Sequence, residues 1–248
     1  MQAVILAGGL ATRLQPLTHT TPKALIEVNG KPFLDLLLGR LRDDGYDDVV
    51  LCVAHLGELI QNFAGDGSRW RLRVRYSNEG KTLLGTGGAL RTALPLLDDA
   101  FLITYGDSYL TFDYASPLAV LGASDDCDAV MSVFHNRGAF DASNVRLRRD
   151  ARGFAWIDAY EKKSADPAFD HIDYGAFSLR KTALEAYAAG TAWGLESLQS
   201  TLSAKGRIRA VISPERFYEI GTPAGLKDLE DYLAKGARPD VDESSQTG

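Results

Sequence analysis

Two glycines followed by two cations near the start of the chain have the residue types and spacing of a polyphosphate-binding loop. An apolar run at residues 3–6 is followed by Gly8 and Gly9, then by Arg13 and, ten residues later, by Lys23. Glycine lets a ligand approach the backbone closely, and a fixed guanidinium and ammonium neutralise phosphate oxygens. Because neither G-x-x-x-x-G-K-[ST] nor G-x-G-x-x-G occurs, we expect a phosphate loop of another type.

An aspartate follows a second apolar run, in the string Tyr105-Gly106-Asp107-Ser108. Open α/β sheets bind ligands at the carboxyl ends of their parallel strands, which is where Asp107 is expected to lie. Gly106 would let the backbone approach such a ligand closely. The alternative is that Asp107 is a helix-capping or turn aspartate.

The composition is that of an ordinary globular protein with an acidic balance. The chain has 248 residues, of which 45% are hydrophobic and 24% charged, with a formal net charge of −6. An acidic chain is a poor partner for nucleic acid. If it binds a nucleoside triphosphate, it must concentrate its cations locally or recruit a divalent metal.

Two further features of the sequence indicate where in the cell the protein is located. The two cysteines, Cys52 and Cys127, each lie in an apolar strand-like run, which favours buried free thiols over a disulfide. The chain starts directly in an apolar strand, without a basic region or cleavage site, and contains no apolar run of about 18 residues. We therefore expect a cytoplasmic protein that does not enter a membrane.

Strand-like and helix-like segments alternate along the first hundred residues, which predicts a doubly wound, mainly parallel sheet in an α/β domain. The chain shows no linker or second core, so we expect a single domain over residues 1–235 and a disordered tail at 236–248. Strands are predicted at 4–6, 24–28, 48–53, 72–76, 101–104, 129–135, 144–149, 153–160, 173–179, 207–212 and 217–220. Helices are predicted at 33–42, 58–63, 89–96, 182–188, 195–204 and 223–234.

The string L-A-G-G-x-x-T-R-L-x-P-L-T-x-x-x-P-K at residues 6–23 resembles the signature of the sugar-1-phosphate nucleotidylyltransferases. The resemblance covers about residues 1–235 and implies the fold shared by nucleotide-diphosphosugar transferases. It also implies the reaction: an NTP and a sugar 1-phosphate give an NDP-sugar and pyrophosphate, with Mg²⁺ as cofactor.

The resemblance implies roles for individual residues around the nucleotide. Arg13, Lys23 and Asp107 would be catalytic, and Asp107 and Glu219 would bind the metal, although the family usually has Asp where Glu219 stands. The L-G-T-G-G string resembles the loop that places backbone amides against the base. The residues expected to bind the nucleotide are Leu6, Ala7, Gly8, Gly9, Arg13, Lys23, Glu79, Gly85, Thr86 and Gly87.

Four residues would bind the sugar phosphate. Glu161 and Lys162 match a family E-K-P string in which Lys163 replaces the proline, and a solvated charge cluster is the alternative. Asp173, two residues before Gly175, stands where the family commonly has an asparagine that contacts the sugar. Asp173 would either accept hydrogen bonds from sugar hydroxyls or anchor a turn.

The identity of the nucleotide rests on Glu79, which takes the place of a Gln in some members. A carboxylate accepts from both N1–H and the N2 amine of guanine, which favours GTP slightly. The chain looks most like heptose-1-phosphate or mannose-1-phosphate guanylyltransferases. A UTP- or CTP-dependent enzyme, for example one acting on N-acetylmuramate 1-phosphate, and a non-catalytic sugar-nucleotide-binding protein stay open, as does a homo-oligomer.

Overall fold

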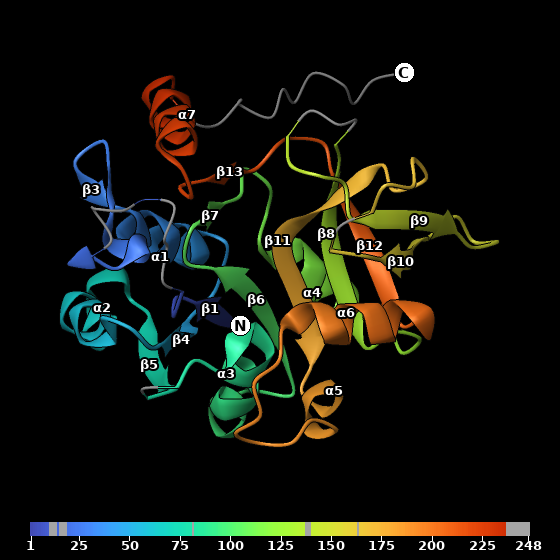
Figure 1. Cartoon of the computed structure of the whole chain (residues 1–248), viewed down its shortest axis with the longest axis horizontal. Helices are drawn as coiled ribbons and strands as arrows, with labels where there is room; N and C mark the ends of the chain where they lie inside the picture. The colour runs from blue at the N-terminus through green and yellow to red at the C-terminus, as the bar shows by residue number, and fades with distance from the viewer. Residues whose placement is uncertain (10–13, 15–18, 81, 137–139, 163, 237–248) are drawn as a thin grey trace.

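A nine-stranded mixed sheet forms the centre of the molecule (Figure 1). The computed structural model describes residues 1–9, 14, 19–80, 82–136, 140–162 and 164–236. In spatial order the strands are β5 (Arg73–Asn78), β4 (Asp48–Val53), β1 (Gln2–Leu6), β6 (Ala100–Tyr105), β11 (His171–Arg180), β8 (Ala129–His135), β12 (Ile208–Ser213), β10 (Ala155–Tyr160) and β9 (Val145–Arg149).

The two halves of this sheet differ in strand direction. β5, β4, β1 and β6 pair in parallel, as the alternating pattern of the first hundred residues predicts. β11 then runs antiparallel to both β6 and β8, and β10 runs antiparallel to both β12 and β9. The predicted α/β fold is confirmed, but the sheet is mixed rather than mainly parallel.

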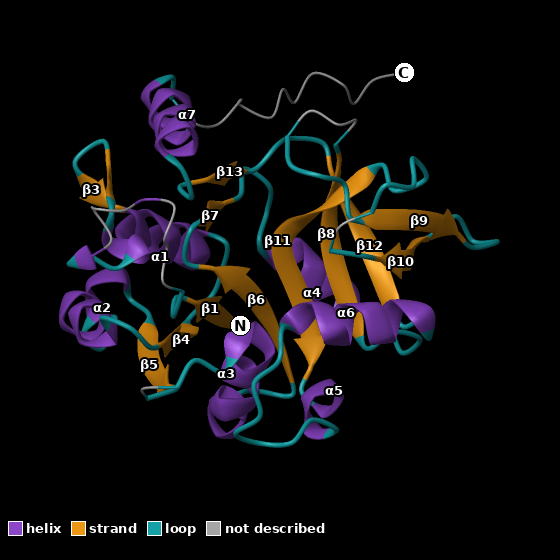
Figure 2. Cartoon of the chain, in the orientation of Figure 1, coloured by secondary structure: helices purple, strands orange, loops and turns teal. Residues whose placement is uncertain are grey.

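Helices cover both faces of the sheet (Figure 2). They are α1 (Phe33–Asp43), α2 (Gly57–Ala64), α3 (Gly85–Ala93), α4 (Ala115–Gly122), α5 (Thr182–Glu185), α6 (Leu195–Ala204) and α7 (Pro223–Ala234). Alternate residues of β1 enter different cores: Ala3 and Ile5 pack in the core that contains α1, and Val4 and Leu6 in the core that contains α3 and α6. Every residue of β1 is therefore buried, as expected for a central parallel strand.

Several predicted segments differ from the observed ones. The strand expected at 24–28 shortens to β2 (Glu27–Val28), which pairs with β3 (Lys31–Pro32) after a 3₁₀ turn at Lys23–Leu25. The strand expected at 217–220 is β13 (Tyr218–Glu219), which leaves the main sheet and pairs with β7 (Ser108–Tyr109). The helix expected at 89–96 begins four residues earlier, at Gly85.

One helix, α4, is absent from the sequence-based prediction. Its residues, A-S-P-L-A-V-L-G, lack the polar stripe that marks a surface helix. The helix packs instead against β6, β8 and β11, where an apolar segment is buried. Among the described residues, every helix falls short of the length and apolarity that a membrane span requires.

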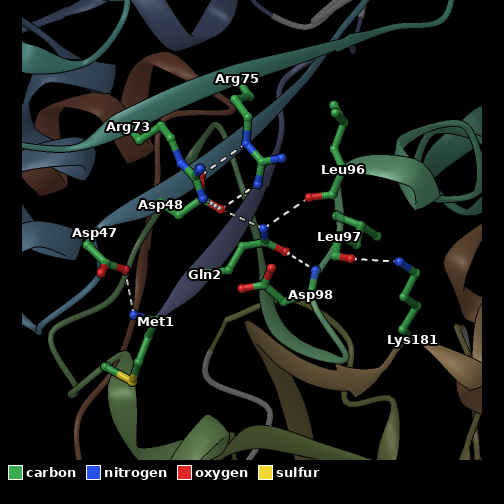
Figure 3. A network of polar contacts seen from close by, with 10 residues as sticks. All are labelled: Met1, Gln2, Asp47, Asp48, Arg73, Arg75, Leu96, Leu97, Asp98 and Lys181. Atoms are coloured by element: carbon green, nitrogen blue, oxygen red, sulfur yellow. Dashed lines mark hydrogen bonds and ion pairs between the residues drawn. The ribbon is translucent and has the colours of Figure 1, made fainter.

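A polar network ties the amino ends of β1, β4 and β5 together (Figure 3). The Gln2 side chain donates to Asp48 Oδ2 at 2.7 Å, and its Oε1 accepts from the Asp98 amide at 2.8 Å. Arg73 and Arg75 both donate to Asp48, which is 5% exposed. Because its members come from three neighbouring strands, β1, β4 and β5, and from the segment before β6, the network fixes the register of this half of the sheet.

Candidate active site

Two cavities adjoin at the carboxyl ends of β1 and β6 and share one lining residue, Tyr105. The first cavity has a volume of about 390 Å³ and lies over the turn that follows β1. The second has a volume of about 770 Å³ and lies beside β11 and the segment around β13. The carboxyl edge of the parallel strands is the ligand-binding edge expected from the sequence.

The first cavity collects most residues predicted to bind a nucleotide. Those that line it are Leu6, Ala7, Gly8, Gly9, Lys23, Glu79, Gly85 and Thr86, together with Asp107. Arg13 lies outside the described residues, so its role stays a prediction. At Gly8 a Cβ would lie 3.2 Å from both the Ala54 Cβ and Glu79 Oε1, so glycine here allows the turn to pass close to its neighbours.

Lys23 and Asp107 meet in this first cavity as an ion pair. Their side chains are 18% and 31% exposed, so the pair is partly shielded from water. Lys23 Nζ lies 3.2 Å from the position of a Cβ at Gly221, so glycine at that position leaves room for the ammonium. An incoming phosphate would find a cation and a carboxylate already side by side.

The Glu79 carboxylate was expected to accept hydrogen bonds from the base with both oxygens, but one oxygen is already bonded to a backbone amide. Its Oε2 accepts a hydrogen bond from the Leu84 amide at 2.7 Å, while its Oε1 lies on the side of Gly8. Burial raises the pKa of Glu79, and the Leu84 hydrogen bond offsets part of that shift. Among the described residues, a backbone amide thus bonds to Oε2 of Glu79 and none to Oε1.

The L-G-T-G-G segment forms the first turn of α3, and its amides are partly used inside the protein. The amides of Gly87 and Gly88 donate to the Trp193 carbonyl at 3.1 and 3.3 Å. A Cβ at Gly87 would overlap the Trp193 ring, and Gly87 lines neither cavity. The structure thus gives Gly87 a packing role, while Gly85 and Thr86 face the first cavity.

The second cavity collects three of the four residues predicted to bind the sugar phosphate. Lys162, Asp173 and Gly175 line it, whereas Glu161 is exposed and does not. Lys162 Nζ lies 3.2 Å from Glu196 Oε1 in an ion pair. The Glu161 amide donates to the carbonyl of Asn144, a lining residue, at 2.9 Å, so the backbone of Glu161 adjoins the cavity although its side chain does not line it.

Asp173 both lines the second cavity and anchors a backbone irregularity. Its Oδ1 accepts from the Gly175 amide at 2.9 Å, and its Oδ2 accepts from Gln199 Nε2 at 3.0 Å. The register of β11 shifts here, and Gly175 has φ +87°, a conformation that favours glycine. Burial raises the pKa of Asp173, against the effect of these two hydrogen bonds.

The pairing of β7 with β13 places the backbones of Asp107 and Glu219, the two predicted metal ligands, next to each other, with Asp107 lining the first cavity and Glu219 the second. Glu219 pairs with Ser108, and the Ile220 amide donates to the Asp107 carbonyl at 3.0 Å. Within the described ranges no group of three or more His, Cys, Asp or Glu side chains could hold a metal alone. Mg²⁺ is commonly held by one or two carboxylates with substrate phosphates and water, and this donor set fits that mode.

Several residues that line the cavities were not predicted, and three of them make contacts that bear on the site. Tyr105 lines both cavities, and its position directly before Gly106 and Asp107 was the available signal. Asn144 Oδ1 accepts from the Asp173 amide at 2.8 Å. Arg216 lies over the rings of Phe140 and Tyr218, at 4.3 and 4.5 Å from their centroids. No sequence pattern marks Asn144 or Arg216.

Comparison with known proteins places these features in a family. The chain is 37% identical over 124 residues to a UTP–glucose-1-phosphate uridylyltransferase of Synechocystis sp., which covers 46% of this chain and 32% of the relative. It is 41% identical over 117 residues to an N-acetylmuramate alpha-1-phosphate uridylyltransferase of Neisseria meningitidis serogroup B, which covers 47% and 51%. These two matches thus span about a third and about half of the relatives' lengths.

Other matches extend along nearly the whole chain. A D-glycero-alpha-D-manno-heptose 1-phosphate guanylyltransferase of Campylobacter jejuni is 29% identical over 234 residues, which covers 94% of this chain and 97% of the relative. The crystal structure of HddC from Yersinia pseudotuberculosis superposes with a TM-score of 0.74 at 25% identity, over 94% of this chain and 99% of that one. A UDP-glucose pyrophosphorylase structure matches in fold, with a TM-score of 0.73 at 16% identity over 94% and 98% of the two chains.

The family model described as nucleotidyl transferase matches residues 2–203. That range contains the turn after β1, the Lys23–Asp107 pair and all of β11. The chain belongs to the nucleotidyl transferase family.

Proposed function

We propose that this protein transfers a nucleoside monophosphate from an NTP to a sugar 1-phosphate, releasing pyrophosphate. The observation that carries the proposal is the junction of the two cavities at Tyr105, with Asp107 on one side and Glu219 on the other. A transfer reaction needs two substrates whose reacting phosphates meet, and two adjoining cavities supply such a meeting point.

The reaction itself needs little covalent chemistry from the protein. A phosphate oxygen of the sugar 1-phosphate attacks the α-phosphorus, the bond to the leaving pyrophosphate breaks, and pyrophosphate takes the electron pair. The attacking oxygen is already ionised at neutral pH, so no general base is needed. The residues contribute by positioning the two phosphates and neutralising their charge.

Each cation has a place in this scheme. Lys23 lies in the first cavity and would contact the phosphates of the NTP, and Arg13 would stabilise the leaving pyrophosphate. Lys162 lines the second cavity and would hold the incoming sugar phosphate. Asp107 and Glu219 would hold Mg²⁺, which neutralises phosphate charge when bound.

We propose GTP as the donor. Glu79 lines the first cavity, where its carboxylate could accept from the N1–H and N2 amine of guanine. The full-length relative from Campylobacter jejuni is a guanylyltransferase, and HddC is also known in a complex with GMP-PN.

UTP is the second candidate. The Leu84 amide already occupies Glu79 Oε2, and the other oxygen, Oε1, suits the single N3–H of uracil. The relative from Neisseria meningitidis is such a uridylyltransferase.

We also propose that residues 1–235 form one domain, that residues 236–248 form a disordered tail and that the protein is cytoplasmic. The strands of the main sheet come from residues between 2 and 213, which supports one domain. Apart from Gly236, the proposed tail lies outside the described residues.

The test measures pyrophosphate release from the four NTPs against mannose, heptose, glucose and N-acetylmuramate 1-phosphates. We expect turnover with at least one pair, and a loss of about a hundredfold or more in Asp107→Asn, because one charge-stabilising group contributes about 3 kcal/mol. Asp99→Asn, at an exposed aspartate before β6, is the matched control and should retain full activity. A non-catalytic sugar-nucleotide-binding protein would give no turnover with any pair.

A further inference from the structure

The segment that leads into α6 contacts lining residues of both cavities. At its start the Trp193 carbonyl caps the first turn of α3, and the Leu195 amide donates to Thr86 Oγ1 at 2.8 Å. One residue later, Glu196 forms the ion pair with Lys162. This segment therefore joins the wall of the first cavity to the lysine on the rim of the second.

Glu196 is the ion-pair partner of the Lys162 ammonium. The lysine side chain is 70% exposed, and the glutamate is 36% exposed. Among the described carboxylates, Glu196 is the one within ion-pair distance of Lys162. A lysine side chain has four rotatable bonds, so without this partner the exposed ammonium would sample many positions.

Gly194 makes room for the glutamate. It has φ −95° and ψ 146°, a conformation that any residue adopts. The three atoms nearest to a Cβ at this position all belong to the Glu196 carboxyl group, and the Cβ would overlap them. A methyl group at position 194 would thus displace the carboxylate without straining the backbone and without changing the charge.

We propose that Glu196 is a positioning residue, which holds the Lys162 ammonium at the rim of the second cavity so that it meets the phosphate of the sugar 1-phosphate. The proposal rests on the proposed function, which gives Lys162 its contact with that phosphate. An ammonium has three donors, so the bond to Glu196 leaves two for phosphate oxygens. Because the lysine is already held, binding of the phosphate restricts it less.

Two substitutions of different kinds test this role. Glu196→Gln removes the charge, and Gly194→Ala keeps the charge but displaces it. Each should raise the KM for the sugar 1-phosphate about fivefold and leave the KM for the NTP unchanged, since a partly exposed ion pair has a modest effect. The control is Gly39→Ala in α1, where a Cβ meets nothing within 4 Å and both KM values should stay at the wild-type level.

The decisive measurement repeats both substitutions in a Lys162→Met background. We expect neither to raise the KM for the sugar 1-phosphate further, because the group that Glu196 positions is gone. Thermal unfolding of each variant should match the wild type, since both partners are on the surface.

Three results would overturn the inference: a lower KM in Glu196→Gln, which would mean that the carboxylate competes with the phosphate; an unchanged KM in Gly194→Ala; or an undiminished effect in Lys162→Met. If the wild type turns over sugar 1-phosphates and the variants behave in one of these ways, only the inference fails. If the wild type neither binds nor turns over any sugar 1-phosphate, the proposed function fails with it.

Discussion

The polar network at the amino ends of β1, β4 and β5 gives a prediction about stability that is independent of function. Asp48 is 5% exposed and accepts hydrogen bonds from Gln2 Nε2 at 2.7 Å and from the Nε atoms of Arg73 and Arg75, each at 3.2 Å. Asp48→Asn keeps the size of the side chain but removes the charge and turns one acceptor into a donor. The side-chain amide would then face donors.

The size of the effect follows from the exposure of the partners. Removing one member of a buried ion pair costs about 3–5 kcal/mol. Arg73 is 67% exposed and can turn to water, whereas Arg75 is 28% exposed and has less freedom. We therefore expect the lower end, about 3 kcal/mol, which for a chain of this length is about 6–12 °C in Tm.

Urea unfolding and calorimetry measure the free energy of unfolding and the Tm of Asp48→Asn, with Asp99→Asn as the control.

The pH dependence of this stabilisation gives a second check. Burial alone would raise the pKa of Asp48, but hydrogen bonds from Arg75, Gln2 and Arg73 outweigh it and hold the pKa below its usual value. The stabilisation is therefore fully present above about pH 4, the usual pKa of an unfolded Asp, and is lost as the pH falls through the lower folded value. A destabilisation below about 1 kcal/mol at pH 7, or one that grows toward acid pH, would refute the reasoning.

Two further substitutions have defined outcomes. Gly87→Ala, whose Cβ would overlap the Trp193 ring, should lower the free energy of unfolding by about 1–3 kcal/mol, whereas Gly39→Ala in α1 should raise it by about 0.5–1 kcal/mol; equal urea midpoints would contradict this. Glu79→Gln should reduce turnover with GTP about tenfold relative to UTP, a loss of about 1.4 kcal/mol. Because burial raises the pKa of Glu79, the preference of the wild type for GTP should weaken as the pH falls and this carboxyl protonates. An unchanged ratio of GTP to UTP turnover would show that Glu79 does not read the base.

The first cavity could be predicted from sequence because its residues follow one strand in a single local string. Leu6 is the last residue of β1 and residues 7–9 come directly after it, and β1 is apolar at consecutive positions because both of its faces are buried. Asp107 follows β6 in the same way. The apolar pattern of a central strand thus predicts that the side chains directly after it lie at the carboxyl edge of the sheet.

What could not be predicted depends on contacts between distant segments. β7 and β13 have two residues each, too few for any periodicity, yet their pairing brings Asp107 beside Glu219. Gly87 was expected at a nucleotide, but its partner is the Trp193 ring, which the sequence does not place near α3. The antiparallel direction of β11 is equally invisible, because a buried strand has the same apolar pattern in either direction.

The central claim is that the α-phosphate moves to the sugar and the outer two phosphates leave together. It is tested most directly by following ³²P from GTP and from UTP in the presence of Mg²⁺ and each sugar 1-phosphate. Label at the α position should appear in the NDP-sugar, and label at the γ position should appear in pyrophosphate, in equal amounts. Release of the γ label as orthophosphate, or retention of all label in the NTP with every sugar 1-phosphate, would contradict the account.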